Sequence, residues 1–323
     1  MDLYELWRAR VRGRFTLKHY LYAWLISARP FAIPWVTLFT LFGALLAGVE
    51  SAERALASCL VVALITLASH FNNNYKDVEL GFDKYIETPE EAELMCSTIC
   101  STIKPYTAAS WIVPLRITSV RFQKANEYLC IALAVTTYLW FFSGDVAVMV
   151  ATLPVVALGL ALARTYVSVF KKARLGEVAV FLGHGFGTVA LGYLSQRPDI
   201  LVALLSGVPT GLISALVYSV DQFVDIRTDF VEKVRAIYES WFNSRMPLGL
   251  YALLAIAFWY NVVVAWVVAG IYPRGVLLVL ATLPLILFTA PQLEYQRSGA
   301  LLKLAITATF LVPMLMCIGA LLH

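Results

Sequence analysis

The feature that most constrains this chain is the recurrence of apolar stretches long enough to cross a lipid bilayer. A membrane-spanning helix needs about 20 mostly apolar residues. Stretches of this kind run along the whole chain, and we place them at 31–49, 55–72, 126–143, 146–163, 178–194, 200–220, 248–269, 275–290 and 301–320. The sequence therefore predicts an all-α integral membrane protein of roughly nine transmembrane helices around a central cavity.

The composition excludes a soluble globular domain. Hydrophobic residues make up 60% of the 323 residues and charged residues only 14%. A soluble domain of this length could not bury so much apolar surface in one core. The net charge of +4 is accounted for by the loops that carry it, so it gives no reason to expect a nucleic-acid partner.

We expect two parts along the chain. Residues 1–30 carry Arg8, Arg10, Arg12, Arg14 and Lys18 among aromatic side chains, with no small-residue cleavage site after a short apolar run. This pattern predicts a basic amphipathic segment that lies on the cytoplasmic surface and leads into the first span. Residues 31–323 contain no Gly-, Pro- or Ser-rich linker, so we expect them to form a single polytopic helical domain.

The basic residues also predict the orientation in the membrane. Cytoplasmic loops carry an excess of Lys and Arg. The loops after the second, fourth, sixth and eighth predicted spans hold many cations, including Lys76, Lys171, Lys172 and Arg235, whereas the intervening loops hold few. We therefore expect a cytoplasmic amino terminus in the plasma membrane, with the polar site facing the cytoplasm.

Two acidic segments break the apolar pattern in the same way. Asn73 and Asp77 are four residues apart at the end of the second predicted span, and Asp221, Asp225 and Asp229 repeat this spacing at the end of the sixth. Residues four apart lie above one another on a helix. Four spans separate the two segments, so both emerge at the same membrane face and can meet at one cavity.

This pattern predicts a magnesium site. Carboxylates near the membrane interior are costly and are functional candidates by default. Mg²⁺ prefers oxygen ligands, uses one or two carboxylates per ion, and is completed by water and substrate phosphate. The alternative is that these acids only form hydrated helix ends balanced by Lys76, Lys84 and Arg227. Two matching acidic segments on one face favour the metal site.

The same residues resemble a known family. Asn73-x-x-x-Asp77, followed by Gly81 and Asp83, resembles the first Asp-rich motif of the UbiA superfamily of intramembrane aromatic prenyltransferases. It is closest to the branch that attaches a polyprenyl group to 1,4-dihydroxy-2-naphthoate in menaquinone biosynthesis. The segment from Asp221 to Asp229 resembles the second motif. Ala28-Arg29-Pro30 and Leu175-Gly176-Glu177 fit other landmarks of the family.

The resemblance implies magnesium-dependent transfer of a polyprenyl group from an isoprenyl diphosphate to an aromatic acceptor. It further implies two bound Mg²⁺ ions and a site within the lipid bilayer. It implies metal ligands at Asn73, Asp77, Asp83, Asp221, Asp225 and Asp229. The residues assigned to catalysis are Asp77, Asp225, Lys171 and Lys172. Those assigned to diphosphate binding are Arg29, Lys104, Arg116, Tyr166, Lys171, Lys172 and Arg227. Positive-inside bias alone also places cations in these loops.

Several alternatives stay open from the sequence. The acceptor could be 4-hydroxybenzoate or geranylgeranylglyceryl phosphate instead of the naphthoate. A secondary transporter is an alternative of another class, although transporters place such carboxylates near the bilayer midplane on broken helices. His70 and His184 are interpreted as structural residues, the first bonding a neighbouring helix and the second packing against small residues.

Overall fold

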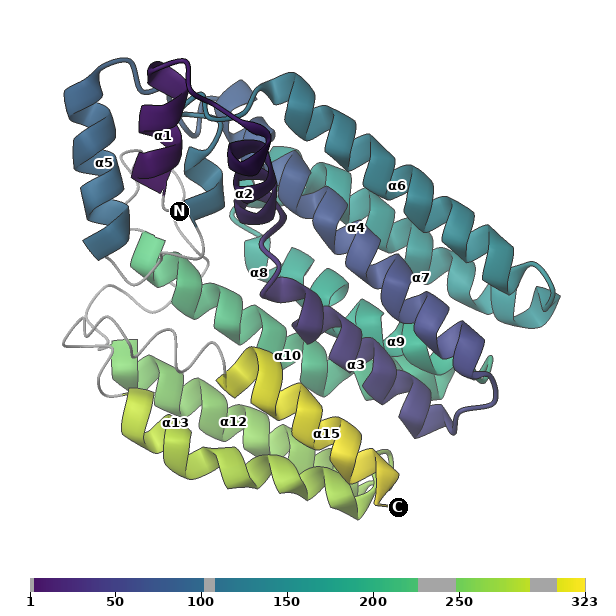
Figure 1. Ribbon diagram of the computed structural model, residues 1–323. Coiled ribbons are helices and arrows are strands. Elements are labelled where there is room, and N and C mark those ends of the chain that lie inside the picture. The colour runs from purple at the N-terminus through teal and green to yellow at the C-terminus, as the bar shows by residue number, and fades with distance from the viewer. Residues whose placement is uncertain (1–2, 102–107, 226–247, 291–306, 323) are drawn as a thin grey trace.

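The computed structural model describes residues 3–101, 108–225, 248–290 and 307–322, and within these ranges every regular element is a helix (Figure 1). The elements, with short 3₁₀ and π segments labelled η, are α1 (Leu3–Val11), α2 (Leu17–Ala28), α3 (Ala32–Ala47), α4 (Ala52–Glu79), α5 (Pro89–Ser101), η1 (Ala108–Trp111), α6 (Val120–Phe142), α7 (Val146–Thr165), η2 (Tyr166–Lys171), α8 (Gly176–Val180), η3 (Phe181–Phe186), α9 (Gly187–Leu194), α10 (Ile200–Asp225), α12 (Leu248–Val268), η4 (Arg274–Thr282), α13 (Leu283–Thr289), η6 (Thr307–Leu311) and α15 (Val312–Leu321).

The apolar helices agree with most of the predicted spans. Among the described residues, six helices are long and apolar enough to cross a membrane: Ala52–Glu79, Val120–Phe142, Val146–Lys171, Gly176–Leu194, Ile200–Ser219 and Leu250–Val268. They coincide with the second to the seventh predicted spans. Two shorter apolar helices, Arg274–Thr289 and Thr309–Leu321, fall on the last two. The count of nine therefore stays a prediction.

The first predicted span is a bent pair. Helix α3 has 16 residues and reaches the length of a span only together with α2, from which it is bent by 48°. The bend lies at Arg29, whose backbone is left-handed (φ 49°, ψ 60°), and at the following proline, which has no N–H to continue the helix. This turn places the Arg29 side chain beside the end of α4.

Helix α4 carries the first acidic motif within its last two turns. It begins at the N-cap Ser51, whose side chain accepts from the backbone N–H of Arg54, and it continues to Glu79. After the helix, the backbone N–H groups of Phe82 and Asp83 both donate to the carbonyl oxygen of Asp77, at 2.8 and 3.0 Å. This C-terminal turn satisfies a carbonyl that would otherwise lack a partner and returns Asp83 toward the helix.

Small residues allow several helices to touch backbone to backbone. Gly43 on α3 and Gly192 on α9 face one another's helices so closely that a Cβ atom on either would overlap the opposite backbone. Gly185 in η3 meets the carbonyl group of Thr210 on α10 in the same way. Close approach of small residues is a common means of packing helices in a bilayer, and here it fixes α9 and η3 against the bundle.

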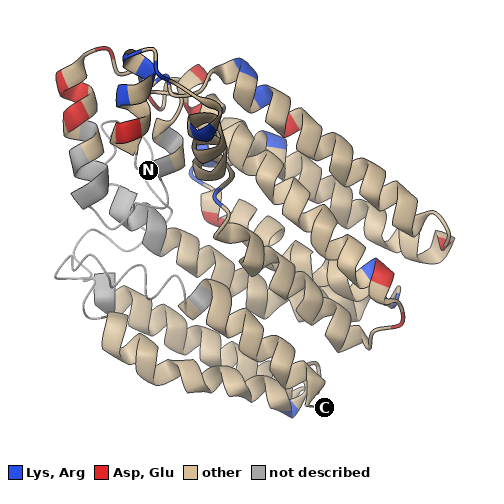
Figure 2. Ribbon diagram, in the orientation of Figure 1, with Lys and Arg blue, Asp and Glu red and all other residues tan. Residues whose placement is uncertain are grey.

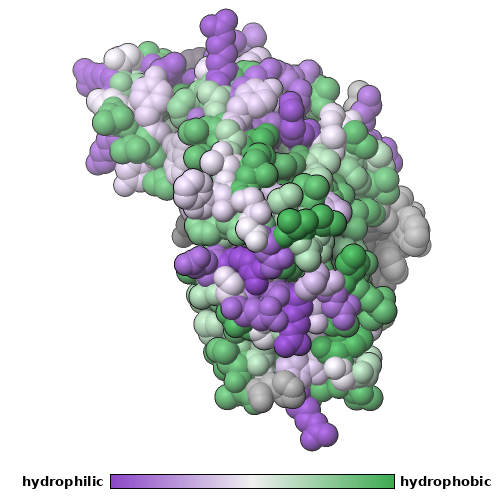
Figure 3. Space-filling model, turned by 90° about the vertical axis from the view of Figure 1, so that its right-hand side faces the viewer, coloured by the Kyte–Doolittle hydropathy of each residue, from purple (hydrophilic) through white to green (hydrophobic). Residues whose placement is uncertain are grey.

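Charged residues gather at the two ends of the helices, and most of the helical surface between them is uncharged (Figure 2). At one end, α1, α5 and η1 form a small hydrophobic cluster over the end of α4 that includes Leu6, Cys96 and Ile112. At the other end, Arg54 Nη1 lies 2.6 Å from Asp145 Oδ2. The backbone N–H of Val148 and the Arg54 guanidinium hold the pKa of Asp145 below its usual range. The side view shows hydrophilic surface interrupting broad apolar surface (Figure 3).

The close contact at Gly192 can be tested by adding one methyl group. We expect Gly192→Ala to lower the free energy of unfolding by about 1–3 kcal/mol, because its Cβ would overlap the Thr40 carbonyl oxygen. Gly159→Ala on α7 is the control, because its Cβ would lie 3.5 Å from Ile65 Cδ1, an ordinary contact. The measurement is unfolding of the purified protein in detergent. Equal stability of the two variants would contradict the packing of α3 on α9.

Candidate functional site

A buried ion pair joins α4 to the end of α7. Lys171 Nζ lies 2.8 Å from Asp77 Oδ1, and the two side chains are 16% and 1% exposed. A charge this deeply buried is costly unless it is paired and hydrogen-bonded. The Lys171 ammonium group therefore provides the partner that a carboxylate at this depth requires.

Asn73 and Arg29 extend the ion pair to a third helix. With the side-chain amide of Asn73 assigned from its partners, its nitrogen donates to Asp77 Oδ2 at 3.2 Å and its oxygen accepts from Arg29 Nη2 at 3.3 Å. Arg29 Nη2 also donates to Asn74 Oδ1 at 3.3 Å. Both carboxylate oxygens of Asp77 are thereby engaged, and α2, α4 and η2 meet in one polar cluster. We call Arg29, Asn73, Asp77 and Lys171 the polar cluster.

The wide turn η2 brings Lys171 and Tyr166 to this cluster. Residues Tyr166–Lys171 form a π-helical segment directly after α7. Such segments are rare and often occur at functional sites. The Tyr166 hydroxyl donates to the Tyr218 hydroxyl on α10 at 2.6 Å, and Tyr166 interacts electrostatically with Lys171, Asp77 and Arg29. Asp83 likewise interacts electrostatically with Lys171.

The remaining predicted site residues are placed differently. Lys172 is exposed, and Arg116 is exposed with its guanidinium 5.2 Å from the Tyr85 ring centroid. Neither contacts the polar cluster through any described interaction. Lys104, Arg227 and Asp229 lie outside the described residues. Asp221 and Asp225 lie on α10, where only the backbone is described at these positions.

The backbone of α10 nevertheless relates the second motif to the first. Tyr218 contacts Tyr166, which borders the polar cluster. Positions 221 and 225 follow Tyr218 by three and seven residues on the same continuous helix. Residues with this spacing share one helix face. The Cα positions of Asp221 and Asp225 therefore lie along the side of α10 that carries Tyr218.

A buried polar network behind α4 was not predicted. Glu127 on α6 is fully buried and accepts from Tyr75 Oη at 2.7 Å and from Asn72 Nδ2 at 3.0 Å. Arg164 Nε lies 3.6 Å from the same carboxylate. These bonds fix the rotation of α4 and so aim Asn73 and Asp77 away from α6. The signal was present in the sequence, because a glutamate inside a predicted span is a functional candidate by default.

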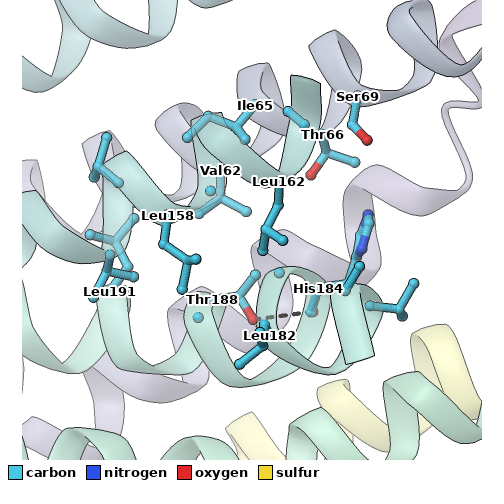
Figure 4. Close-up of a pocket in the computed structure, with 18 of the residues that line it drawn as sticks. Val62, Ile65, Thr66, Ser69, Leu158, Leu162, Leu182, His184, Thr188 and Leu191 are labelled. Carbon is cyan, nitrogen blue, oxygen red and sulfur yellow. Dashed lines mark hydrogen bonds between the residues drawn. The ribbon is translucent and has the colours of Figure 1, made fainter. Parts of the chain in front are cut away.

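An apolar pocket lies beside α4 (Figure 4). Its volume is about 630 Å³ including the open mouth, and α4, α7, η3 and α9 supply most of the lining. Figure 4 shows Leu158 and Leu191 toward one end, and Thr66, Ser69 and His184 toward the other. Tyr166 also lines the pocket, so this residue belongs to both the pocket and the surroundings of the polar cluster.

The described side chains supply only part of a metal site. No group of three or more His, Cys, Asp or Glu residues that could hold a metal is found among them. The carboxylate of Asp77 and the amide oxygen of Asn73 are oxygen donors of the kind that Mg²⁺ prefers. Further carboxylates would have to come from Asp83 or from the second motif.

Comparison with known proteins gives a match in structure but none in sequence. No protein-family model matches this chain, and no curated protein matches it in sequence. A solved structure of a digeranylgeranylglyceryl phosphate synthase in membranes superposes with a TM-score of 0.56 and 13% sequence identity. The match covers 94% of this chain and 99% of the other. The two proteins share a fold. At this identity the likeness extends to the helical architecture, and together with the apolar helices it makes this chain an integral membrane protein.

The ion pair predicts a difference between two neighbouring lysines. We expect Lys171→Met to lower the free energy of unfolding by about 3–5 kcal/mol, because it leaves the buried carboxylate of Asp77 without its cation. Lys172→Met is the control and should change stability by less than about 0.5 kcal/mol, because Lys172 is exposed. Thermal unfolding in detergent measures both. A similar loss in the two variants would argue against a buried Lys171–Asp77 pair.

Proposed function

We propose that this protein is a Mg²⁺-dependent prenyltransferase that moves a polyprenyl group from an isoprenyl diphosphate to an acceptor inside the membrane. The observation that carries this proposal is the continuity of one face of α4. Val62, Thr66 and Ser69 line the apolar pocket, and Asn73 and Asp77 follow at helical spacing, so one helix face leads from the pocket to the polar cluster. A ligand with an anionic head and an apolar chain is complementary to that arrangement.

The diphosphate head belongs at the polar cluster. Arg29 and Lys171 are cations already in place there, and they would stabilise the charge that develops on the departing diphosphate oxygens. Mg²⁺ would act there as a Lewis acid toward the diphosphate. Its ligands would be Asn73 and Asp77, with Asp83, Asp221, Asp225 and Asp229 completing two ion sites. Lys104, Arg116, Lys172 and Arg227 stay proposed as diphosphate contacts from the loops.

The prenyl chain belongs in the apolar pocket. Much of its lining is aliphatic, and these side chains have no charge or hydrogen-bonding group that would hold water or an ion. They are Val62, Ile65, Leu158, Leu162 and Leu191. Exclusion of water protects the allylic cation that forms when the C–O bond breaks. Tyr166, at the junction of pocket and polar cluster, would face that cation with its aromatic ring.

For the acceptor we propose an aromatic compound, with 1,4-dihydroxy-2-naphthoate first because of the motif resemblance. 4-Hydroxybenzoate is an alternative. Geranylgeranylglyceryl phosphate is the second candidate, and the fold shared with a digeranylgeranylglyceryl phosphate synthase favours it. A secondary transporter is disfavoured because Asp77 lies in the last turn of α4 and Arg29 at the end of α2. We further propose that this end faces the cytoplasm across the plasma membrane.

The proposal predicts product formation that depends on both metal and motif. The purified protein in lipid would receive geranylgeranyl diphosphate with Mg²⁺ and, in parallel, dihydroxynaphthoate, hydroxybenzoate or geranylgeranylglyceryl phosphate. We expect prenylated product from one acceptor, its loss on addition of EDTA, and a loss of at least about 100-fold in Asp77→Ala and in Asp225→Ala, since each removes a metal ligand.

Glu53→Ala is a matched control, because Glu53 lies in the first turn of the same helix, at the opposite end from Asp77. It should keep the wild-type rate. No product with any acceptor, together with no Mg²⁺-dependent binding of the diphosphate, would refute the prenyltransferase and favour a carrier.

A further inference from the structure

Three polar side chains in the apolar pocket have hydrogen-bonding capacity that the protein does not use. Thr66 and Ser69 on α4 and His184 in η3 all line the pocket. Within the described part of the chain, neither hydroxyl and neither imidazole nitrogen has a hydrogen-bond partner. Figure 4 places the three residues together at one end of the pocket, with His184 across from the two hydroxyl residues.

This lack of partners is unusual for this protein. Hydroxyl groups on its helices generally donate to a carbonyl one turn earlier, as Thr37 does to Ile33, Ser58 to Arg54 and Thr188 to Gly185. That bond is the ordinary way for Ser and Thr to be satisfied in a helix. Thr66 is only 5% exposed and still does not make it. An unsatisfied polar group in a membrane interior is costly, so these side chains require another partner.

The imidazole of His184 is held in a defined plane. Its ring stacks on Trp35 of α3, with centroids 6.0 Å apart and planes inclined by 29°. Next to it, Gly185 packs against the backbone of Thr210, so η3 and α10 touch backbone to backbone at this point. His70 differs, because its Nδ1 is bonded to the carbonyl oxygen of Ala28 at 2.8 Å. The structural role expected from the sequence therefore fits His70, whereas His184 keeps free nitrogens at the pocket wall.

The depth of the three residues matches the reacting carbon of a bound donor. Ser69 precedes Asn73 by one turn, and Thr66 precedes it by two. One turn of α-helix rises about 5.4 Å. With the diphosphate at Asn73 and Asp77, the first carbon of the prenyl chain would lie near the level of Ser69. A group that reacts with this carbon must approach at the same level.

We propose that Thr66, Ser69 and His184 form the binding subsite for the hydroxyl-bearing head of the acceptor, and that His184 is the base that removes its proton. This inference rests on the proposed function. The allylic C–O bond breaks and its electron pair leaves with the diphosphate. An electron pair of the acceptor oxygen or of its activated ring carbon forms the new bond to the prenyl carbon. The proton that the acceptor loses moves to a free imidazole nitrogen of His184.

The experiment separates acceptor chemistry from donor binding. Three variants, His184→Gln, Ser69→Ala and Thr66→Val, would be assayed with geranylgeranyl diphosphate, Mg²⁺ and the acceptor that the wild-type protein converts. In parallel, Mg²⁺-dependent binding of the inert geranylgeranyl thiodiphosphate would be measured. Thr37→Val is the matched control, because the Thr37 hydroxyl already donates to Ile33 and Thr37 does not line the pocket.

We expect His184→Gln to lower kcat by about 100-fold or more, the contribution of a general base, while thiodiphosphate binds as in the wild type. Ser69→Ala and Thr66→Val should raise KM for the acceptor by about 3- to 10-fold with little change in kcat, since each loses one hydrogen bond. Thr37→Val should change neither constant.

Two results would overturn the subsite. Wild-type kcat in His184→Gln, together with wild-type acceptor KM in both hydroxyl variants, would show that these groups do not meet the acceptor. A parallel loss of thiodiphosphate binding in His184→Gln would assign this residue to the donor or to the fold. Both outcomes differ from failure of the proposed function, in which the wild-type protein itself forms no product and binds no thiodiphosphate.

Discussion

The architecture of the candidate site depends on one ion pair, between Asp77 and Lys171, in the protein interior, where burying a charge costs free energy. Asp77 is almost completely buried, and Lys171 and Asn73 each bond to one of its two carboxylate oxygens. The pair requires α4 and the end of α7 to stay in register. Around this contact, the bend at Arg29 turns α2 toward the cluster, and the network at Glu127 holds the opposite face of α4 against α6. Helix α4 thereby bonds to three partners: η2 through Lys171, the end of α2 through Arg29, and α6 through Glu127.

This division of α4 explains how a single helix can serve both packing and chemistry. The face toward α6 is polar and bonded to that helix, since Tyr75 Oη and Asn72 Nδ2 both donate to Glu127. The face toward η2 and the pocket carries two kinds of polar group. Thr66 and Ser69 have no hydrogen-bond partner within the described part of the chain, and Asp77 is paired with Lys171. In a bilayer the backbone is satisfied within the helix. Side-chain hydrogen bonds are therefore what distinguishes a structural face from one available to a ligand.

The sequence predicted the class of fold and part of the site, for physical reasons that can be named. Length and hydropathy are sufficient to find spans, because a bilayer has a fixed thickness. The spacing of Asn73 and Asp77 placed them on one face, and in the structure Asn73 bonds to Asp77, which pairs with Lys171. The positions of Lys172 and Arg116 could not be predicted, because charge alone does not say which cation of a loop turns inward. The wide turns η2 and η3 also leave no clear mark in hydropathy. They decide the direction of Lys171 and His184 respectively.

The turn at η2 has a consequence for how this site could change over time. In an α-helix, two residues five positions apart point about 140° away from each other, since each residue turns the chain by about 100°. In a π segment the hydrogen bonds run from residue i to i+5, which brings such residues much nearer to the same side. Tyr166 and Lys171 are five apart. Loss of a single residue between them would restore an ordinary helix in which the two are four positions apart and point within about 40° of each other. The shared orientation of these residues can thus be kept across a change of one residue in chain length.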